Sequence, residues 1–504
     1  MKKTFFAFFS ALLVASSSFG QDAPYAEDLQ FVRELRSRGY NDLAREYLDK
    51  LAKNASAALK KELPLERALT EMEAANDEPD SNKRIALYAQ ASQQFQEFLR
   101  ANPTHPRAAE TKFDIARATT LQGKTQLSRA LLEDDLTVRT TEGSKARATL
   151  AAAFNQLKQL PKTPETELAM ALNLLDQSDT YLNTGNEADT SASGQRIQEA
   201  RQIFDKLGQG DPASKITWLA RAWAGRCEEM LDNPNKAIRM LEAVTSATGP
   251  PVQDGKRLAR YFLMLARKKL PKETPDPKDS LNNYLIKQAL DWLRDYRNYK
   301  NTPEGLGVQY SLAKLWLEEA DNTKLDPTLR DRYAAQARSY LSNIDRTENE
   351  FTDRAKRLKI KAMDKQGTFK KPIDRLTTFE DCYVRAQYEQ MQIAEDAKQF
   401  KDNKSRAEEE RKKRIKNIIA ALQAALKKVG VKDSVVDTNN ARTLLTFYLL
   451  EQDKPKEAIE VGEPFARRDQ RSSQAASAAI YALVAYGQLL AKRERDAADI
   501  KALK

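Results

Sequence analysis

The sequence predicts an all-α protein built as a stack of helical hairpins, an α-α hairpin solenoid, and two observations support this prediction. The chain of 504 residues has only 17 glycines and 19 prolines, and it is rich in Ala, Leu, Glu, Lys, Arg and Gln, which lose little side-chain freedom in a helix. The second observation is a repeated spacing, in which an alanine is followed four and seven positions later by large apolar residues. It occurs at Ala91, Phe95 and Phe98, at Ala200, Phe204 and Leu207, at Ala237, Leu241 and Val244, and at Ala289, Leu293 and Tyr296. These offsets place the three side chains on one helical face, where the alanine lets a neighbouring helix come close.

Residues 1–20 are predicted to be a secretory signal peptide that takes no part in the fold. Lys2 and Lys3 give a short positive start, residues 5–15 are apolar, and residues 18–20 supply the small residues that a signal peptidase reads. The alternative is an uncleaved N-terminal anchor, although about 20 apolar residues are needed to span a bilayer. We expect no transmembrane segment in the mature chain.

The first predicted hairpin covers residues 30–51. Its first helix carries Phe31, Val32 and Leu35, and Gly39 lies in the turn. The second helix repeats the alanine spacing with Ala44, Leu48 and Leu51. Both helices therefore have one apolar face, as two helices that pack against each other require.

The most complete predicted unit covers residues 217–244. Gly225 is followed twelve positions later by Ala237. Together with the spacing that ends at Pro103, these residues make the chain resemble divergent tetratricopeptide repeat (TPR) proteins of the exported bacterial type. The resemblance implies that Gly225 is the small residue at which two helices cross. The resemblance implies a TPR-like superhelix, whose concave face is built from the first helix of each pair and binds extended peptides or helices.

The repeats are irregular. The alanines that mark them lie at residues 44, 91, 200, 237, 289, 337 and 458. Only the step from 200 to 237 approaches the family repeat of about 34 residues, and the long gaps must hold degenerate hairpins. This favours a divergent solenoid, with an unrelated array of α-α hairpins as the alternative.

Three helical regions are expected after the leader. They are N-terminal hairpins, central repeats and a C-terminal region, over residues 21–182, 195–350 and 375–504. The C-terminal region is expected to hold one long charged helix between about residues 378 and 428, and a degenerate repeat at Ala458. Within that helix, acidic residues 408–410 precede basic residues 412–414 by four positions, which favours an exposed helix. It would either project as a coiled-coil arm or connect two blocks of hairpins as a solvated helix.

The sequence offers no set of residues for catalysis, for cofactor binding or for metal binding. His105 is the only histidine, so a Ser-His-Asp or Cys-His arrangement has one candidate base, and its place between prolines in a repeat turn favours a structural role. Glycine-rich phosphate loops are absent, and no Cys or His cluster could hold zinc. The four tryptophans lie in helical apolar patterns, which favours core packing, at Trp218, Trp223, Trp292 and Trp316. We therefore predict a protein that is not an enzyme, with no catalytic, cofactor or metal site.

The cysteines leave two possibilities open. Cys227 and Cys382 are the only two, and they lie 155 positions apart. An isolated pair is no disulfide framework. They either form one bridge or remain two separate buried thiols.

The charge and the resemblance together predict a binding function. The formal net charge is +11, which in an exported protein favours envelope proteins or anionic envelope polymers as partners, and not nucleic acid. The predicted function is an exported scaffold that binds proteins or peptides in the periplasm or cell envelope. Aligned on Gly225, the family's groove positions fall on Arg226 and Glu229, which the resemblance implies as partner contacts. The alternatives are a binder of anionic cell-wall or outer-membrane polymers, and an all-α polysaccharide-active enzyme with a carboxylate pair.

Overall fold

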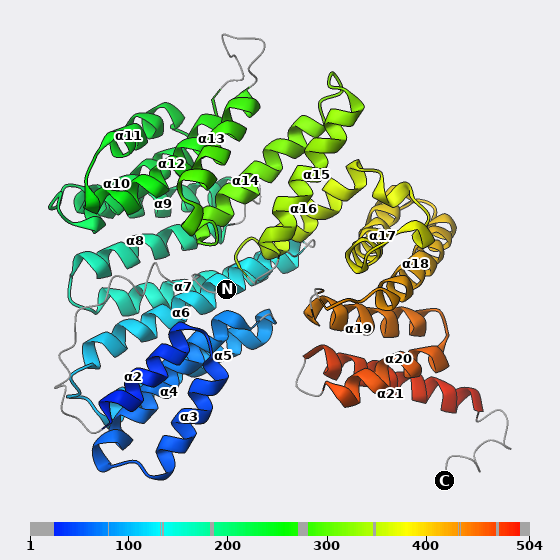
Figure 1. Cartoon of the computed structure of the whole chain (residues 1–504), viewed down its shortest axis with the longest axis horizontal. Coiled ribbons are helices and arrows are strands. Elements are labelled where there is room, and N and C mark those ends of the chain that lie inside the picture. The colour runs from blue at the N-terminus through cyan, green and yellow to red at the C-terminus, as the bar shows by residue number, and fades with distance from the viewer. Residues whose placement is uncertain are drawn as a thin grey trace. The chain divides into compact units, whose positions relative to one another are not determined.

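The computed structural model of the chain describes residues 25–493, except residues 79, 132, 134–135, 182–185, 271–280, 346–348, 432, 434 and 470–472. Within these residues the chain forms twenty α-helices and no β-strand, which confirms the predicted all-α solenoid of hairpins (Figure 1). The helices are α2 (Ala26–Ser37), α3 (Asn41–Lys53), α4 (Ala57–Asp77), α5 (Ser81–Ala101), α6 (Ala108–Ala130), α7 (Leu136–Lys158), α8 (Pro164–Asp179), α9 (Glu187–Gly208), α10 (Lys215–Met230), α11 (Pro234–Ser246), α12 (Gln253–Lys268), α13 (Leu281–Asp295), α14 (Pro303–Ala320), α15 (Pro327–Ile344), α16 (Thr352–Lys365), α17 (Phe379–Gln399), α18 (Lys404–Lys427), α19 (Val435–Glu451), α20 (Pro455–Arg468) and α21 (Ser473–Arg493). The predicted signal peptide, residues 1–20, lies outside the described residues. None of the described helices is long and apolar enough to cross a membrane.

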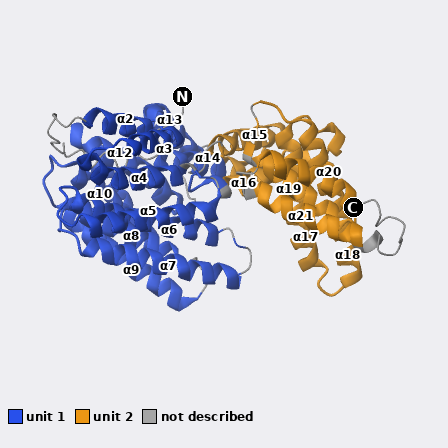
Figure 2. Ribbon diagram, turned by 90° about the horizontal axis from the view of Figure 1, so that it is seen from below, with its two compact units in different colours: residues 1–315, 347–354 blue, residues 316–346, 355–504 orange. Residues whose placement is uncertain are grey.

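The helices form two compact units (Figure 2). Unit 1 consists of residues 1–315 and 347–354, and unit 2 consists of residues 316–346 and 355–504. In both units helices that follow each other in the chain pack together, such as α6 with α7 and α17 with α18. This is the arrangement of a repeat protein, in which each hairpin packs against its neighbours.

Unit 1 has two layers, formed by the first and by the second helices of the hairpins. The first helices touch one another, because α2 contacts α4, α6 contacts α8, and α10 contacts both α8 and α12. Successive second helices, such as α9 and α11, make no contact of similar extent in the described part of unit 1. Helices that crowd together lie on the inside of a curved stack. The layer formed by α2, α4, α6, α8, α10 and α12 is therefore called the inner layer below.

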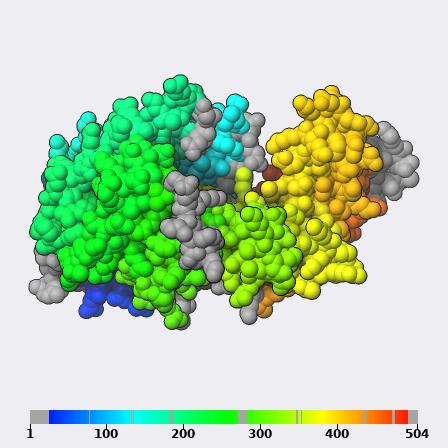
Figure 3. Space-filling view, turned by 90° about the horizontal axis from the view of Figure 1, so that it is seen from above, coloured from blue at the N-terminus to red at the C-terminus, as the bar shows by residue number. Residues whose placement is uncertain are grey.

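The alanines of the repeated spacing lie where the helices pack. Each of them is fully buried in the second helix of its hairpin, at Ala44, Ala91, Ala200, Ala237, Ala289, Ala337 and Ala458. The large residues that follow them fill the adjoining core, and Phe95, Phe204 and Leu241 are fully buried. On the face seen in Figure 3, the atoms of the green helices of unit 1 form a closely packed surface.

Gly225 marks a close helix crossing, as the resemblance implied. A Cβ atom at this position would lie 2.7 Å from Leu241 Cδ2 on α11. The same contact recurs in the long gap between the alanines at 91 and 200, where a Cβ on Gly123 would lie 2.7 Å from Leu150 Cγ. The α6–α7 hairpin is therefore a further repeat, whose longer helices hide its spacing in the sequence.

The repeat at Ala289 differs from its prediction by one position. Leu293 and Tyr296 were expected in the core, but both are only partly buried, and Trp292 is fully buried. The indole N–H of Trp292 donates a hydrogen bond to the backbone oxygen of Arg257 at 3.0 Å. In this repeat the large buried residue therefore lies three positions after the alanine in place of four.

The single charged helix expected over residues 378–428 is two helices, so this prediction is wrong. α17 ends at Gln399 and α18 begins at Lys404, and the two pack against each other as a hairpin. Asn403 caps α18, because its side chain accepts a hydrogen bond from the backbone N–H of Arg406. Neither a projecting arm nor a solvated connector is formed, since Arg414 of α18 binds the buried carboxylate of Glu389 on α17 at 2.8 Å.

Both cysteines are free thiols in the structure. Cys227 lies buried in unit 1 and Cys382 lies buried in unit 2. Burial raises the pKa of the Cys227 thiol to about 12. Of the two possibilities that the sequence left open, the structure has two separate buried thiols.

Candidate binding surface on the inner layer of unit 1

Ion pairs connect successive helices of the inner layer. The bridging pairs are Arg36–Glu66 between α2 and α4 (2.5 Å), Arg117–Glu73 between α6 and α4 (3.2 Å), Lys124–Asp176 between α6 and α8 (3.5 Å), and Lys269, just after α12, with Glu229 of α10 (3.2 Å). The step from α8 to α10 has no such bridge among the described residues. Charged groups of α8 and α10 are therefore not paired with each other across this step in the described part of the chain.

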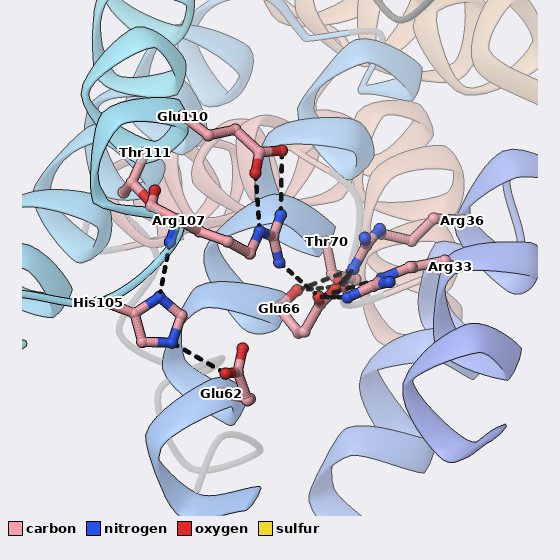
Figure 4. A network of polar contacts seen from close by, with 9 residues as sticks. All are labelled: Arg33, Arg36, Glu62, Glu66, Thr70, His105, Arg107, Glu110 and Thr111. Carbon is pink, nitrogen blue, oxygen red and sulfur yellow. Dashed lines mark hydrogen bonds and ion pairs between the residues drawn. The ribbon is translucent and has the colours of Figure 1, made fainter. Parts of the chain in front are cut away.

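Glu66 on α4 holds the N-terminal end of the inner layer together (Figure 4). Its carboxylate accepts hydrogen bonds from Arg36 at 2.5 Å and from Arg33 and Arg107 at 3.0 Å. Burial would raise the pKa of Glu66, but the three guanidinium groups lower it to about 2. Because its carboxylate is fully buried and bound by three arginines, Glu66 is a structural residue.

His105 belongs to the same network (Figure 4). Its Nε2 atom lies 2.9 Å from Oε1 of Glu62, and its Nδ1 atom accepts a hydrogen bond from the backbone N–H of Arg107 at 3.2 Å. The imidazole also packs edge-on against the ring of Phe98. These contacts use both ring nitrogens to hold the turn before α6, as the predicted structural role requires.

Lys124 and Asp176 form the pair at the α6–α8 step. Desolvation raises the pKa of the Asp176 carboxyl, and the attraction of Lys124 opposes this rise. The attraction of Asp176 in turn raises the pKa of Lys124. The side chain of Lys124 is 44% exposed and that of Asp176 is 20% exposed, so both groups reach solvent.

Asp179 lies one helical turn after Asp176, at the end of α8. Asp179 is exposed, yet desolvation, reinforced by the charge of Asp176, raises the pKa of its carboxyl to about 6. The side chain of Asp179 therefore reaches solvent, while the protein around it reduces the solvation of its charge. No hydrogen bond or ion pair to Asp179 is formed within the described residues, and Arg226 and Arg354 attract it only from a distance.

Asp114 on α6 shows the contrasting case. Burial raises the pKa of its carboxyl to about 7, and Arg117 lies 3.9 Å away. Because Asp114 is buried, no ligand can reach it without a rearrangement of the inner layer. Asp179 therefore differs from Asp114 in being accessible.

The two residues predicted to contact a partner, Arg226 and Glu229, lie one turn apart on α10 and form an ion pair with each other. Glu229 is buried and also binds Lys269, so its carboxylate has two basic partners. The guanidinium carbon of Arg226 lies 5.8 Å from the centre of the Phe262 ring, and the side chain keeps partial exposure. Both residues lie in the inner layer, and their contact with a partner stays a prediction.

Aromatic groups and a short segment lie beside these charges. Tyr261 on α12 is close enough to Arg226 for the two charges to interact, and desolvation raises the pKa of its hydroxyl. Residues 349–354 belong to unit 1, and the ring of Phe351 packs 5.5 Å from the ring of Tyr310 on α14. We call Lys124, Asp176, Asp179, Arg226 and Tyr261 the α8–α10 site.

The α8–α10 site holds two carboxyls and two basic groups. Desolvation raises the pKa of Asp176 and of Asp179, while the charge of Lys124 opposes the rise at Asp176 and the charges of Arg226 and Lys124 oppose it at Asp179. The described residues include no group of three potential metal ligands. Because Asp179 has no hydrogen bond or ion pair within the described residues, its carboxyl is the group of this site that can accept a bond from an ammonium or guanidinium group.

Sequence reasoning found Arg226 and missed Lys124, Asp176 and Asp179. The spacing of three positions between the two aspartates on one predicted helix was a readable signal. The pairing of Lys124 with Asp176, 52 positions later, was not readable, because it depends on how α6 and α8 stack.

Comparisons with known proteins give no family for this chain. No family model matches it, and no curated protein matches it. Among solved structures it is similar to the human IFIT1 dimer with PPP-AAAA (12% identity, 93% of this chain and 91% of that chain, TM-score 0.39) and to yeast Tom70 (12% identity, 93% and 98%, TM-score 0.23). With TM-scores this low the likenesses carry no conclusion, and the helical-repeat architecture rests on the chain's own helices.

Proposed function

We propose that this chain is a non-enzymatic scaffold that binds a segment of a partner protein on the inner layer of unit 1. In this proposal a lysine or arginine of the partner segment pairs with Asp179 in the α8–α10 site. The observation that carries the proposal is the state of Asp179, which is exposed, desolvated and without an ion pair among the described residues. A carboxylate in this state gains more from a basic partner than one that water already solvates.

Asp179→Asn is expected to weaken partner binding by about tenfold or more, because a charge-assisted hydrogen bond contributes about 1.5–3 kcal/mol. Binding to the natural chain is expected to decline as the pH falls through about 6, where Asp179 takes up a proton. The measurement is the affinity for the captured partner between pH 5 and 8. A weak pH dependence that Asp179→Asn leaves unchanged would contradict the pairing.

The same variant is expected to make unit 1 more stable at pH 7. The folded pKa of Asp179 lies above its ordinary value of 3.8, so its protonated form favours the folded state. That contribution is present below about pH 4 and is lost as the pH rises through about 6. A substitution that lowers binding and raises stability indicates a functional residue. Replacing a structural carboxylate would lower both binding and stability.

Photo-crosslinking identifies the partner directly. A photoreactive side chain is placed at Arg226 on the inner layer and, as a control, at Leu136, which is exposed on the second helix α7. We expect a small set of proteins to crosslink from position 226 alone, and to be lost in the Asp179→Asn background. Asp42→Asn on α3 is the matched control, since Asp42 is exposed and already pairs with Arg45.

Two other experimental outcomes would favour a different function for the chain. Retention of polyanions in place of proteins, sensitive to salt and indifferent to Asp179→Asn, would favour a binder of anionic envelope polymers. The raised pKa values of Asp176 and Asp179 are also what a carboxylate-pair hydrolase needs. Release of reducing sugar ends from an envelope polysaccharide, abolished by Asp179→Asn, would favour that enzyme.

We further propose that the scaffold works in a bacterial cell envelope after export. The support is the sequence of residues 1–20, with a positive start and an apolar run of residues 5–15. N-terminal sequencing of the protein from its own cells is expected to begin at about Gln21. A protein that retains Met1 in the cytosolic fraction would contradict this proposal and leave the binding proposal intact.

A further inference from the structure

Three helix connections meet at one end of unit 2. They join α16 to α17, α18 to α19 and α20 to α21, over residues 366–378, 428–434 and 469–472. Lys428, just after α18, lies close enough to Cys382 near the start of α17 for the two groups to interact electrostatically. The side chain of Asn439 near the start of α19 donates a hydrogen bond to Asp469, just after α20, at 2.6 Å. The described residues of the three connections, with the helix ends beside them, are called the basic end of unit 2 below.

Exposed basic side chains gather at the basic end of unit 2. They come from the first connection and from the ends of α18 and α20, at Lys370, Lys371, Arg375, Lys427 and Arg468. Within the described residues, none of these five side chains forms a hydrogen bond or an ion pair. Desolvation lowers the pKa of Arg442 on α19, the like charge of Arg468 lowers it further, and Asp469 opposes this. The five exposed charges therefore have no counter-charge bound to them in the described part of the chain.

Acidic side chains at the same end are largely used within the fold. Asp433 accepts a hydrogen bond from the backbone N–H of Gly430 at 2.6 Å, and Asp469 accepts the one from Asn439. Asp374 differs from these two because it is exposed. Carboxylates at this end therefore hold the connections in shape, while the exposed lysines and arginines remain open to an anionic partner.

The connection between α18 and α19 adds an apolar tip to these charges. Val431 is fully exposed, and Val435 and Val429 are 71% and 40% exposed. The backbone N–H of Asp433 donates a hydrogen bond to the backbone oxygen of Gly430 at 3.1 Å, so the valine at position 431 lies in a closed turn. Exposed valines gain nothing from a soluble polyanion. They do gain from transfer to the boundary between the headgroups and the acyl chains of a bilayer.

We propose that the basic end of unit 2 docks on an anionic lipid membrane, with its lysines and arginines over the lipid headgroups and Val431 at the boundary to the acyl chains. Each basic residue near an anionic leaflet increases the partition to the membrane about fivefold. The buried apolar groups add a contribution that salt does not screen. This docking is independent of the partner segment proposed for unit 1, because it uses residues of unit 2 alone.

Sedimentation of the full chain with vesicles tests the docking. The natural chain is expected to bind vesicles of phosphatidylcholine and phosphatidylglycerol, and to bind phosphatidylcholine alone far more weakly. Replacing Lys371 and Lys427 by glutamate is expected to weaken this binding by about 25-fold or more, from the fivefold contribution of each lysine. Lys401→Glu with Lys404→Glu is the matched control, because it changes the charge equally at the other end of the α17–α18 hairpin. Equal binding to both kinds of vesicle, no binding to either, or equal losses in the two double variants would overturn the proposal.

A fluorescent label at position 431 tests the insertion. Val431→Cys can be labelled selectively with an environment-sensitive dye, because Cys227 and Cys382 are buried. We expect a blue shift with the anionic vesicles from this position, and none from Leu136→Cys, which is exposed on α7 in unit 1. Without a label, Val431→Asp should weaken vesicle binding about tenfold or more and leave the circular dichroism spectrum unchanged. Vesicle binding without the blue shift would overturn the insertion. Retention of heparin by a chain that binds no vesicles would indicate a polymer binder and overturn the docking.

Discussion

Glu66→Gln is expected to destabilise unit 1 by about 3–5 kcal/mol, the usual cost of removing one partner from a buried ion pair. The carboxylate of Glu66 is fully buried between Arg33, Arg36 and Arg107. A neutral amide keeps the shape of the side chain but removes the buried negative charge that Arg33, Arg36 and Arg107 share. Arg36 and Arg107 are themselves nearly buried, so water cannot replace the lost carboxylate.

The pH dependence of this contribution has a definite sign. The folded pKa of Glu66 is about 2, and its ordinary value is 4.5. A carboxyl whose pKa is lowered by folding stabilises the fold above its unfolded pKa, and this contribution is lost as the pH falls toward the folded pKa. The difference corresponds to about 3 kcal/mol. Between pH 4.5 and 2 the natural chain should therefore lose stability more steeply than Glu66→Gln.

Urea denaturation followed by circular dichroism measures the loss, and hydrogen exchange in α2, α4 and α6 locates it. Glu110→Gln is the matched control, because Glu110 binds the same Arg107 but its side chain is 40% exposed, whereas that of Glu66 is fully buried. An exposed ion pair contributes about 0–1 kcal/mol, so this variant should unfold almost as the natural chain does. Equal effects of the two substitutions would contradict the central role of Glu66.

Gly255→Ala is expected to destabilise unit 1 by about 1–3 kcal/mol or more, although alanine is the better helix former. A Cβ atom on Gly255 of α12 would lie 2.6 Å from the backbone oxygen of Trp218 on α10. That oxygen belongs to a helix and cannot move without shifting the helix itself. The substitution therefore forces α10 and α12 of the inner layer apart.

Two other glycines calibrate this result in the same unfolding experiment. At Gly225 the new Cβ would meet the side chain of Leu241, which can rotate, so Gly225→Ala should cost less than Gly255→Ala. At Gly194, inside α9, a Cβ meets nothing within 4 Å, and alanine should stabilise the helix by about 0.5–1 kcal/mol. If Gly255→Ala were as stable as Gly194→Ala, the close contact of α10 with α12 would be wrong.

The helical-repeat architecture could be predicted from the sequence because it depends on the spacing of residues within single helices. The alanine spacing places one small and two large residues on a face within two helical turns, so Ala44, Ala91 and Ala200 could be assigned to the core from the sequence alone. The errors arose where a local signal was weak. The break at residues 400–403 depends on the cap by Asn403, and helix-forming residues on both sides concealed it.

The candidate site was less readable because its residues come from different hairpins. Glu66 and Arg107 are 41 positions apart, and no periodicity links an acid in one repeat to a base in the next. Asp179 is distinguished by its surroundings, which raise its pKa to about 6. The resemblance could indicate that α10 lines the inner layer. It could not indicate that the carboxylate of Asp179 on α8 has no ion pair among the described residues.

The packing of each hairpin against its nearest neighbours also determines how the chain can fold. Most helix contacts join elements that follow each other in sequence, such as α8 with α9 and α9 with α10. Contacts between nearby segments close short loops and form quickly. An N-terminal hairpin can therefore pack against its neighbours before the C-terminal hairpins have folded. If the chain emerges residue by residue, from a ribosome or from a translocation pore, native structure can accumulate behind the exit while the remainder is still being delivered.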